Sequence, residues 1–200
     1  MIRLLLLFGT CLALAACGGG GEKGPLPSPQ VQAIAYVPQD TPKLTLVSVI
    51  NNRTGQGGHT ALLVTGSQQV LFDPAGSFRH NSITEYGDVL YGMSPRFFQG
   101  FKSAHARDSH HVVTQEIPVS PAVAERALSL VQGYGNVGSA FCANSTSSIL
   151  RQLPGFEDIK VTFFPTNLRD QIALKPGVVT EQYYENDAGD VVEGLAGLDL

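Results

Sequence analysis

A cysteine and a histidine in this chain have the surroundings of a reactive thiol and an imidazole that activates it. Cys142 begins an apolar repeat of helical spacing that continues through Ile149 and Leu150, so the thiol is predicted in the first turn of a helix. Unpaired backbone N–H groups and the helix dipole stabilise a thiolate there, and a nearby imidazole adds to the effect. The pair singled out for nucleophilic chemistry is therefore Cys142 with His59.

Cys142 also has a purely structural explanation. Free cysteines are among the most buried residue types, and this one lies on the apolar stripe of its helix. Its lack of a partner favours reactivity, since exported proteins mostly use cysteines in pairs. Cys11 lies in a predicted signal peptide and Cys17 at a predicted lipidation site, so Cys142 is the free thiol expected in the mature chain. Spacing alone leaves both interpretations open.

The elements that position this pair are predicted to be strands followed by helices. Strands rich in β-branched residues and leucine are predicted at 44–50, 59–64, 70–72, 110–118 and 160–164, and 178–184 could pair with 191–192. Residues 77–108 have no period and are predicted to be mostly loop. Ser120 and Pro121 begin a helix that runs to about Gly133, and a short helix is predicted at 166–173. The pattern predicts an α+β fold, a small antiparallel sheet with packed helices.

Asp73 directly follows the hairpin that carries His59. Residues 73–76 have the types that a type I turn favours, so a turn alone explains Asp73. A two-residue hairpin loop at 66–67 pairs His59 with Pro74 and sends Asp73 to the opposite face. A three-residue loop, or one bulge, pairs His59 with Asp73 directly. The sequence leaves both registers open.

The order of these residues resembles that of a known family. The run 57–64 (GGHTALLV) is followed by a polar residue on the next strand, and the run 141–144 (FCAN) opens a later helix. This order is similar to that of the circularly permuted NlpC-type papain-like enzymes, whose branch includes the lecithin retinol acyltransferase relatives. The resemblance covers residues 44–155.

The resemblance implies a permuted papain-like domain with a catalytic triad. Cys142 would be the nucleophile, His59 the general base, and Asp73 the residue that orients the imidazole. Many members have asparagine where Phe141 stands, which bears on the substrate subclass. The retinol-type members have histidine where Asp73 stands, which leaves the third residue open.

Two other patterns are predicted to carry no chemistry. The spaced glycines of residues 133–138 match a dinucleotide fingerprint, but a helix rather than a strand precedes them, so no cofactor is expected. His105, Asp108, His110 and His111 form a cluster with the residue types of a metal site. Neighbouring residues of a strand point to opposite faces, so His110 and His111 are poor joint ligands; surface histidines and no metal are predicted.

The N-terminus predicts export and lipidation. Arg3 precedes an apolar run that ends at Ala16, and this is shorter than the roughly 20 residues of a spanning helix, so residues 1–16 are predicted to be a signal peptide. Residues 14–17 (LAAC) resemble a bacterial lipobox, in which Cys17 is diacylated and anchors the chain in a membrane. Gly18 follows where an aspartate would favour the inner membrane, so the periplasmic face of the outer membrane is preferred.

The remaining sequence predicts one tethered domain. Residues 17–40 are rich in glycine and proline and are predicted to be a lipidated, flexible tether, and residues 41–200 the papain-like domain. The net charge of −4, with no basic stripe, gives no support for nucleic-acid binding.

We expect an envelope thiol hydrolase or acyltransferase that attacks an amide or ester, with cell-wall peptides as the first substrate class and lipid acyl groups as the second. A non-catalytic envelope lipoprotein that binds wall peptide or a partner protein is the alternative. A metal-binding domain built on the 105–111 cluster is a further rival.

Overall fold

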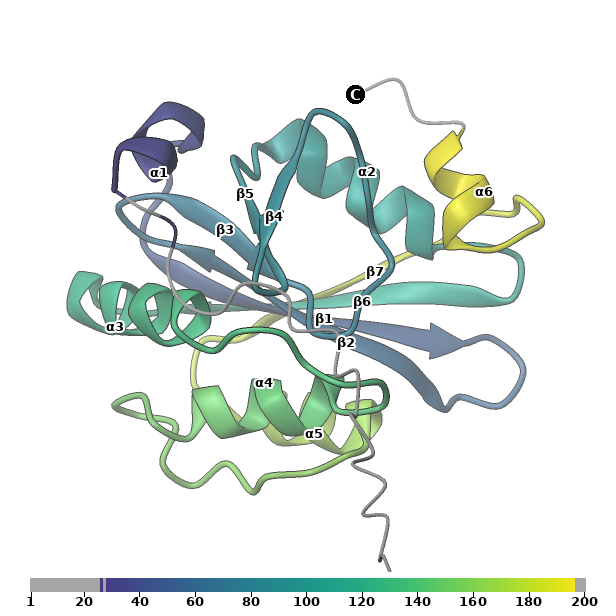
Figure 1. Cartoon of the computed structure of the whole chain (residues 1–200). Helices are drawn as coiled ribbons and strands as arrows, with labels where there is room; N and C mark the ends of the chain where they lie inside the picture. The colour runs from purple at the N-terminus through teal and green to yellow at the C-terminus, as the bar shows by residue number, and fades with distance from the viewer. Residues whose placement is uncertain (1–25, 27, 197–200) are drawn as a thin grey trace, which may run out of the picture.

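The computed structural model describes residue 26 and residues 28–196, and this part of the chain forms an α+β domain (Figure 1). Seven strands form one antiparallel sheet in the order β4-β5-β3-β2-β1-β6-β7. The strands are β1 Lys43–Asn51, β2 Gly57–Thr65, β3 Gln69–Phe72, β4 Thr84–Tyr86, β5 Val89–Tyr91, β6 His110–Pro118 and β7 Val179–Tyr183. The helices are α1 Ser28–Ile34, α2 Pro95–His105, α3 Pro121–Gln132, α4 Cys142–Leu150, α5 Pro165–Ile172 and α6 Val191–Ala196. The predicted α+β class is confirmed.

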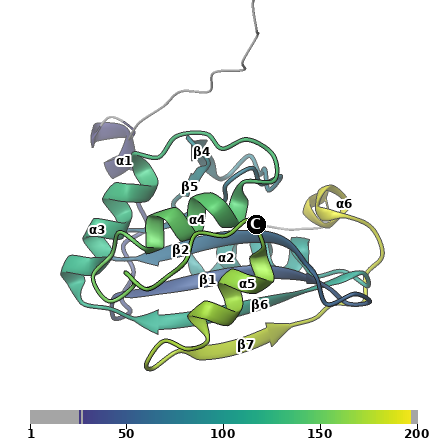
Figure 2. The same cartoon turned by 90° about the horizontal axis from the view of Figure 1, so that it is seen from below.

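Helices cover both faces of the sheet (Figures 1 and 2). Alternate residues of β2 enter two separate cores: Leu62 and Val64 pack toward α3, α4 and α5, whereas Ala61 and Leu63 pack toward α2 and α6. Because both faces of the sheet are covered, the sequences of β1 and β2 are almost continuous runs of apolar residues. The predicted strands over 44–50, 59–64, 70–72 and 110–118 are confirmed.

Helices α2 and α3 begin in the same way, each with a proline that directly follows a serine. Ser94 accepts a hydrogen bond from the N–H of Phe97 at the start of α2, and Ser120 accepts one from Val123 at the start of α3. The prediction of a helix from Pro121 is confirmed. The prediction of mostly loop over 77–108 is wrong, because this segment contains α2 and the short strands β4 and β5.

Two other sequence predictions are also wrong. Residues 160–164 form no strand, because side chains satisfy their N–H groups: Lys160 donates to Gln171 Oε1 and Thr162 to Ser147 Oγ. Strand β7 pairs with β6 rather than with residues 191–192, which begin α6. The Asp190 carboxylate accepts the N–H groups of residues 192 and 193 and caps that helix.

The described part of the segment predicted to be a tether contains a helix. Residues 28–34 form α1, whose Val31 and Ile34 pack against the core on the α3 side of the sheet, and Gln69 donates a backbone hydrogen bond to Tyr36. The predicted signal peptide and Cys17 lie outside the described residues. Among the residues described, no helix is both long and apolar enough to cross a membrane.

Candidate active site

Cys142 is the first residue of α4, and its thiol lies against the edge of β2. Phe141 provides no side-chain cap, so the first turn of α4 keeps its backbone donors free of a side-chain acceptor. Strand β3 ends at Phe72, and its pairing with β2 stops at Leu62, which leaves the β2 edge open near Thr60. The backbone N–H groups of Thr60 and Ala143 both act to lower the pKa of Cys142.

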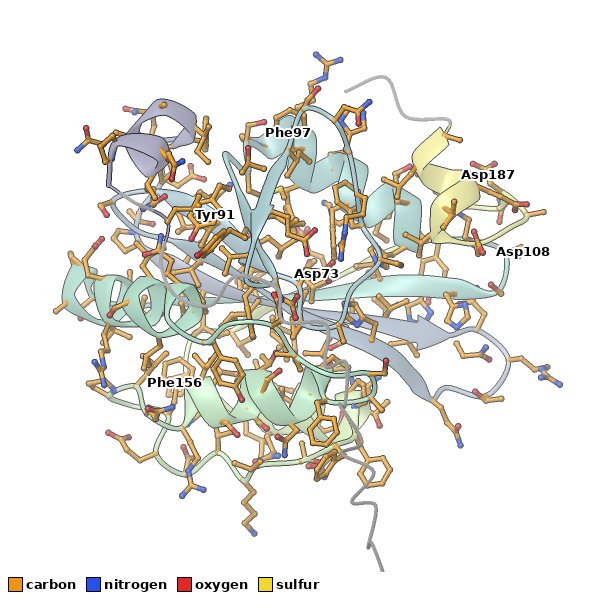
Figure 3. The ribbon with its side chains drawn as sticks, in the orientation of Figure 1. Asp73, Tyr91, Phe97, Asp108, Phe156 and Asp187 are labelled. Carbon is orange, nitrogen blue, oxygen red and sulfur yellow. The ribbon has the colours of Figure 1, made fainter. Side chains whose placement is uncertain are left out.

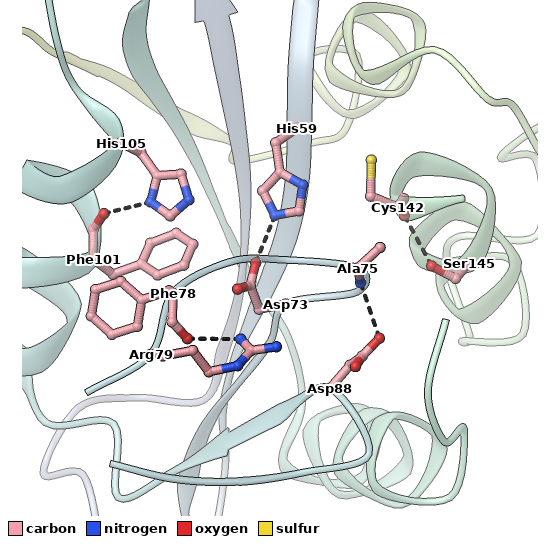
Figure 4. Close-up of polar contacts among 10 residues, drawn as sticks. All are labelled: His59, Asp73, Ala75, Phe78, Arg79, Asp88, Phe101, His105, Cys142 and Ser145. Atoms are coloured by element: carbon pink, nitrogen blue, oxygen red, sulfur yellow. Dashed lines mark hydrogen bonds and ion pairs between the residues drawn. The ribbon is translucent and has the colours of Figure 1, made fainter. Parts of the chain in front are cut away.

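His59 lies on β2 between the thiol and Asp73 (Figure 4). Its Nε2 is 2.6 Å from Asp73 Oδ1, and the imidazole interacts with the Cys142 side chain closely enough to lower the pKa of the thiol. Asp73 is buried, with 2 % of its surface exposed. The structure therefore brings together the three residues that the sequence analysis singled out, in the order thiol, imidazole, carboxylate.

The hairpin register explains why Asp73 reaches His59. Thr65 pairs with Gln69, so the loop has three residues, 66–68, and the last pair of the ladder is Leu62 with Phe72. Continued by one position, this register puts Asp73 opposite Ala61, on the same face as His59. The prediction that a three-residue loop pairs His59 directly with Asp73 is wrong, because the carboxylate reaches the imidazole along the diagonal.

The turn at 73–76 and the hydrogen bond to His59 use different parts of Asp73. The Asp73 carbonyl accepts the N–H of Gly76 at 2.9 Å and closes the turn, while its carboxylate points to His59. Ala75 has a φ of 56°, which a type I turn does not allow at this position and a type II turn requires, so the predicted turn type is wrong. A Cβ at Gly76 would collide with the Asp73 carboxylate.

Asp88 is a residue of this site that the sequence analysis missed. Its Oδ2 accepts the N–H of Ala75 at 3.0 Å and the N–H of Val137 at 2.8 Å, and its carbonyl accepts the N–H of Asp73 at 2.8 Å. One buried carboxylate thus joins the turn that carries Asp73 to the loop that precedes Cys142. Asp88 itself has a φ of 59°, in a turn between two short strands that have no clear period in the sequence.

His105 is the second missed residue, since it was predicted to be a surface histidine. It is buried, its ring stacks on that of His59 at 5.8 Å and 11°, and its Nδ1 is 2.8 Å from the Phe101 carbonyl. That carbonyl can only accept, so Nδ1 carries the proton and donates it. His105 therefore packs on one face of the His59 imidazole.

The other members of the 105–111 cluster lie apart from it. His110 contacts the side chains of Asn51 and Ser109, whereas His111 contacts Asn52 and stacks on Tyr184. Asp108 binds the backbone of Asp187, away from Asp73 (Figure 3). Among the residues that the structure describes, no three histidine, cysteine or carboxylate side chains are gathered as metal ligands would be.

The charges in the triad support one another. Burial by itself lowers the pKa of His59, but the charge and hydrogen bond of Asp73 outweigh it and raise this pKa to about 10. Burial raises the pKa of Cys142, but the hydrogen bond and charge of His59 and the two backbone N–H groups lower it below that of an ordinary thiol. Burial also raises the pKa of Asp73, and His59 outweighs this effect and lowers it. Near neutral pH the imidazolium and the carboxylate are therefore the favoured states, and the thiolate is more favoured than that of an ordinary cysteine.

No protein-family model, no curated protein and no solved structure matches this chain. The function is therefore inferred from the site itself.

Proposed function

We propose that the protein is a thiol hydrolase or acyltransferase that attacks an amide or ester carbonyl through Cys142. The observation that carries the proposal is the grouping of thiol, imidazole and buried carboxylate, with Nε2 of His59 at 2.6 Å from Asp73 and the imidazole lowering the pKa of Cys142. A cysteine that only filled the core would need neither a charged histidine nor two backbone donors on its sulfur.

The reaction has two steps. The Cys142 thiolate forms a bond to the carbonyl carbon, the bond to the leaving group breaks, and the His59 imidazolium gives its proton to that group. Water or an amine then attacks the thioester and passes a proton back to His59 as the carbon–sulfur bond breaks. The backbone N–H groups of Thr60 and Ala143 lie at the sulfur and would also stabilise the oxygen that becomes negative.

Cell-wall peptide amides and lipid acyl groups are the two substrate classes that we propose, because the N-terminal sequence predicts a lipid-anchored envelope protein. The same residues support the proposed resemblance to permuted papain-like enzymes: histidine on a strand, acid after the next strand, cysteine at the start of a later helix.

Acylation of Cys142 by an activated ester tests this function. The purified protein is mixed with 4-nitrophenyl acetate, and release of nitrophenolate and the mass of the intact chain are followed. We expect an acetyl adduct on Cys142 that disappears in Cys142→Ala and forms at least about 100-fold more slowly in His59→Ala. A wild-type chain that reacts no faster than free cysteine would instead indicate a binding protein with a structural thiol.

A further inference from the structure

We infer that a cavity beside His59 binds a small carboxylate, which the buried guanidinium of Arg107 holds. The inference goes beyond the proposed function, because it needs a cavity and a buried cation but no reactive thiol. It adds a binding site for a charged group next to the imidazole of the candidate active site.

The cavity lies on the side of the sheet that α2 and α6 cover. Its volume is about 350 Å³, which is at the lower end of the range for small-molecule sites. Its walls come from the start of β2 with His59, the turn at 75–77, the end of α2, the segment 107–110 and residues 189–191. Segments that are far apart in the sequence therefore enclose one space large enough for a small ligand.

Arg107 brings a buried positive charge to this cavity. Its side chain is 8 % exposed, and its backbone exchanges hydrogen bonds of 2.8 and 3.0 Å with that of His110. Its guanidinium lies against α6 at Gly194, where an added Cβ would collide with it. A charge held in this way out of water is costly unless an anion compensates it.

The ion pair that Arg107 makes within the described chain is a weak one. Its Nη1 donates to Asp187 Oδ2 at 3.4 Å, a long hydrogen bond, and the Asp187 side chain is 72 % exposed (Figure 3). Its Nε donates to the neutral carbonyl of Ala104 at 3.2 Å. A guanidinium has further N–H groups in a planar fork, which matches the two oxygens of a carboxylate. A ligand carboxylate in the cavity would therefore be a better partner than Asp187.

A serine hydroxyl in the same wall can donate a second hydrogen bond. Asn51 Nδ2 donates to His110 Nε2 at 3.4 Å, so the neutral ring carries its proton on Nδ1. His110 donates that proton to Ser109 Oγ at 2.9 Å, which leaves the hydroxyl hydrogen of Ser109 for another acceptor. Ser109 and Arg107 line the cavity two residues apart, so both can donate to one anionic group.

The charges around the cavity favour an anion with a single negative charge. Asp190 also lines the cavity, and its Oδ1 accepts the N–H groups of residues 192 and 193. A phosphate dianion would add two charges near this carboxylate, with one guanidinium to balance them. A carboxylate has one charge and two oxygens for the guanidinium fork, so it is the class of ligand that fits.

A matched pair of ligands tests the inference. N-acetylglycine and N-acetylglycinamide differ in that a neutral amide replaces the carboxylate, and their affinities are measured by isothermal titration calorimetry. We expect the wild type to bind N-acetylglycine at least about tenfold more tightly, since hydrogen bonds to charged groups are the stronger ones. Arg107→Gln should lose that preference. Arg53→Gln is the matched control, because Arg53 is exposed and outside the cavity wall, and it should keep the preference.

A second variant keeps the inference testable if Arg107→Gln does not fold, which urea unfolding would reveal. Ser109→Ala removes the hydroxyl donor from an exposed position and leaves the guanidinium in place. It should weaken the binding of N-acetylglycine by about fivefold.

Equal affinities of the wild type for the two ligands, or a preference that persists in folded Arg107→Gln, would overturn the inference. Unchanged binding in Ser109→Ala would do the same where Arg107→Gln is unfolded. Inorganic phosphate that binds more tightly than N-acetylglycine would overturn the assignment to a carboxylate. None of these results bears on the acylation of Cys142, which tests the proposed function separately.

Discussion

At the scale of single residues, the site depends on which way one buried imidazole is held. Asp73 bonds Nε2 of His59, which leaves the other ring nitrogen for the thiol, and His105 stacks on the ring. Because Asp73 raises the pKa of His59 to about 10, the imidazole keeps its charge through the neutral range. The charged imidazole in turn lowers the pKa of Cys142.

The first prediction concerns the reactivity of Cys142. Iodoacetamide labelling, measured from pH 5 to 10 by mass spectrometry of the Cys142 peptide, should follow a thiol with a lowered pKa. His59→Ala removes the hydrogen bond and charge that lower this pKa and leaves the burial that raises it. The midpoint should therefore rise by at least about one pH unit. Asp73→Asn should move it less, in the same direction, because His59 stays in place but loses its carboxylate.

His110→Ala is the control, since that ring contacts Asn51 and Ser109 rather than the thiol. It should leave the labelling curve unchanged. A wild-type Cys142 that resists labelling below pH 8, together with no shift in His59→Ala, would show a structural cysteine and end the catalytic interpretation.

The second prediction concerns the close approach of Gly76 to the Asp73 carboxylate. Gly76→Ala puts a methyl group where that carboxylate lies, so either the turn or the carboxylate must move. We expect a loss of about 1–3 kcal/mol in the free energy of unfolding by urea. The labelling midpoint of Cys142 should also rise, because His59 loses its partner.

Gly138→Ala is the matched control for Gly76→Ala. It lies in the loop before Cys142, where an added Cβ meets nothing within 4 Å. Its stability should stay within about 0.5 kcal/mol of the wild type. Equal effects from the two substitutions would mean that glycine is needed for reasons other than the Asp73 contact.

At the scale of elements, much of what positions the pair could be predicted from the sequence. The apolar runs of β1, β2 and β6 and the repeats of α3 and α4 are long enough for their period to be read. The three-residue strands β4 and β5 are too short for a period, and residues 160–164 resemble a strand although side chains satisfy their N–H groups. Local pattern therefore placed Cys142 at the start of a helix and His59 on a strand.

The contacts that complete the site could not be predicted in the same way. Asp73 depends on a register that one loop residue changes, and the sequence allowed two- and three-residue loops. His105 belongs to a helix in a segment that the sequence predicted to be mostly loop. Its stacking partner, His59, lies on a strand that is far from it in the sequence. Asp88 joins two loops whose proximity follows only from the assembled sheet.

The third prediction tests that link between loops. Asp88→Gly removes the carboxylate while suiting the left-handed backbone at this position, so the N–H groups of Ala75 and Val137 lose their acceptor without added strain. We expect a loss of about 1–3 kcal/mol in unfolding free energy and slower labelling of Cys142. Asp88→Asn keeps an oxygen for these donors and should be affected less. Wild-type stability and labelling in Asp88→Gly would show that other contacts hold the two loops.

At the scale of the whole molecule, the sheet separates two cores, and the site lies where β2 extends past the end of β3. The Cys142 helix belongs to one side of the sheet and His105 to the other, with His59 and Asp73 between them (Figures 1 and 4). Helix α1 ties the described start of the chain to the same domain. Residues 28–34 of the proposed tether therefore pack with the domain.

The last prediction concerns how the molecule is held at the membrane. The sequence around Cys17 predicts diacylation, and two acyl chains hold a protein on a bilayer where one does not. Cys17→Ala should therefore move the protein from the washed membrane fraction to the soluble fraction, as measured by immunoblot after expression in a bacterium that processes lipoproteins. Cys11→Ala is the matched control, because that cysteine leaves with the predicted signal peptide and its loss should change nothing.

The domain should still label at Cys142 when released, since the triad is built from β2, the turn after β3 and α4. Recovery of Cys17→Ala in washed membranes at the wild-type level would refute lipidation as the anchor, and would leave the chemistry of the site to be judged on Cys142 alone.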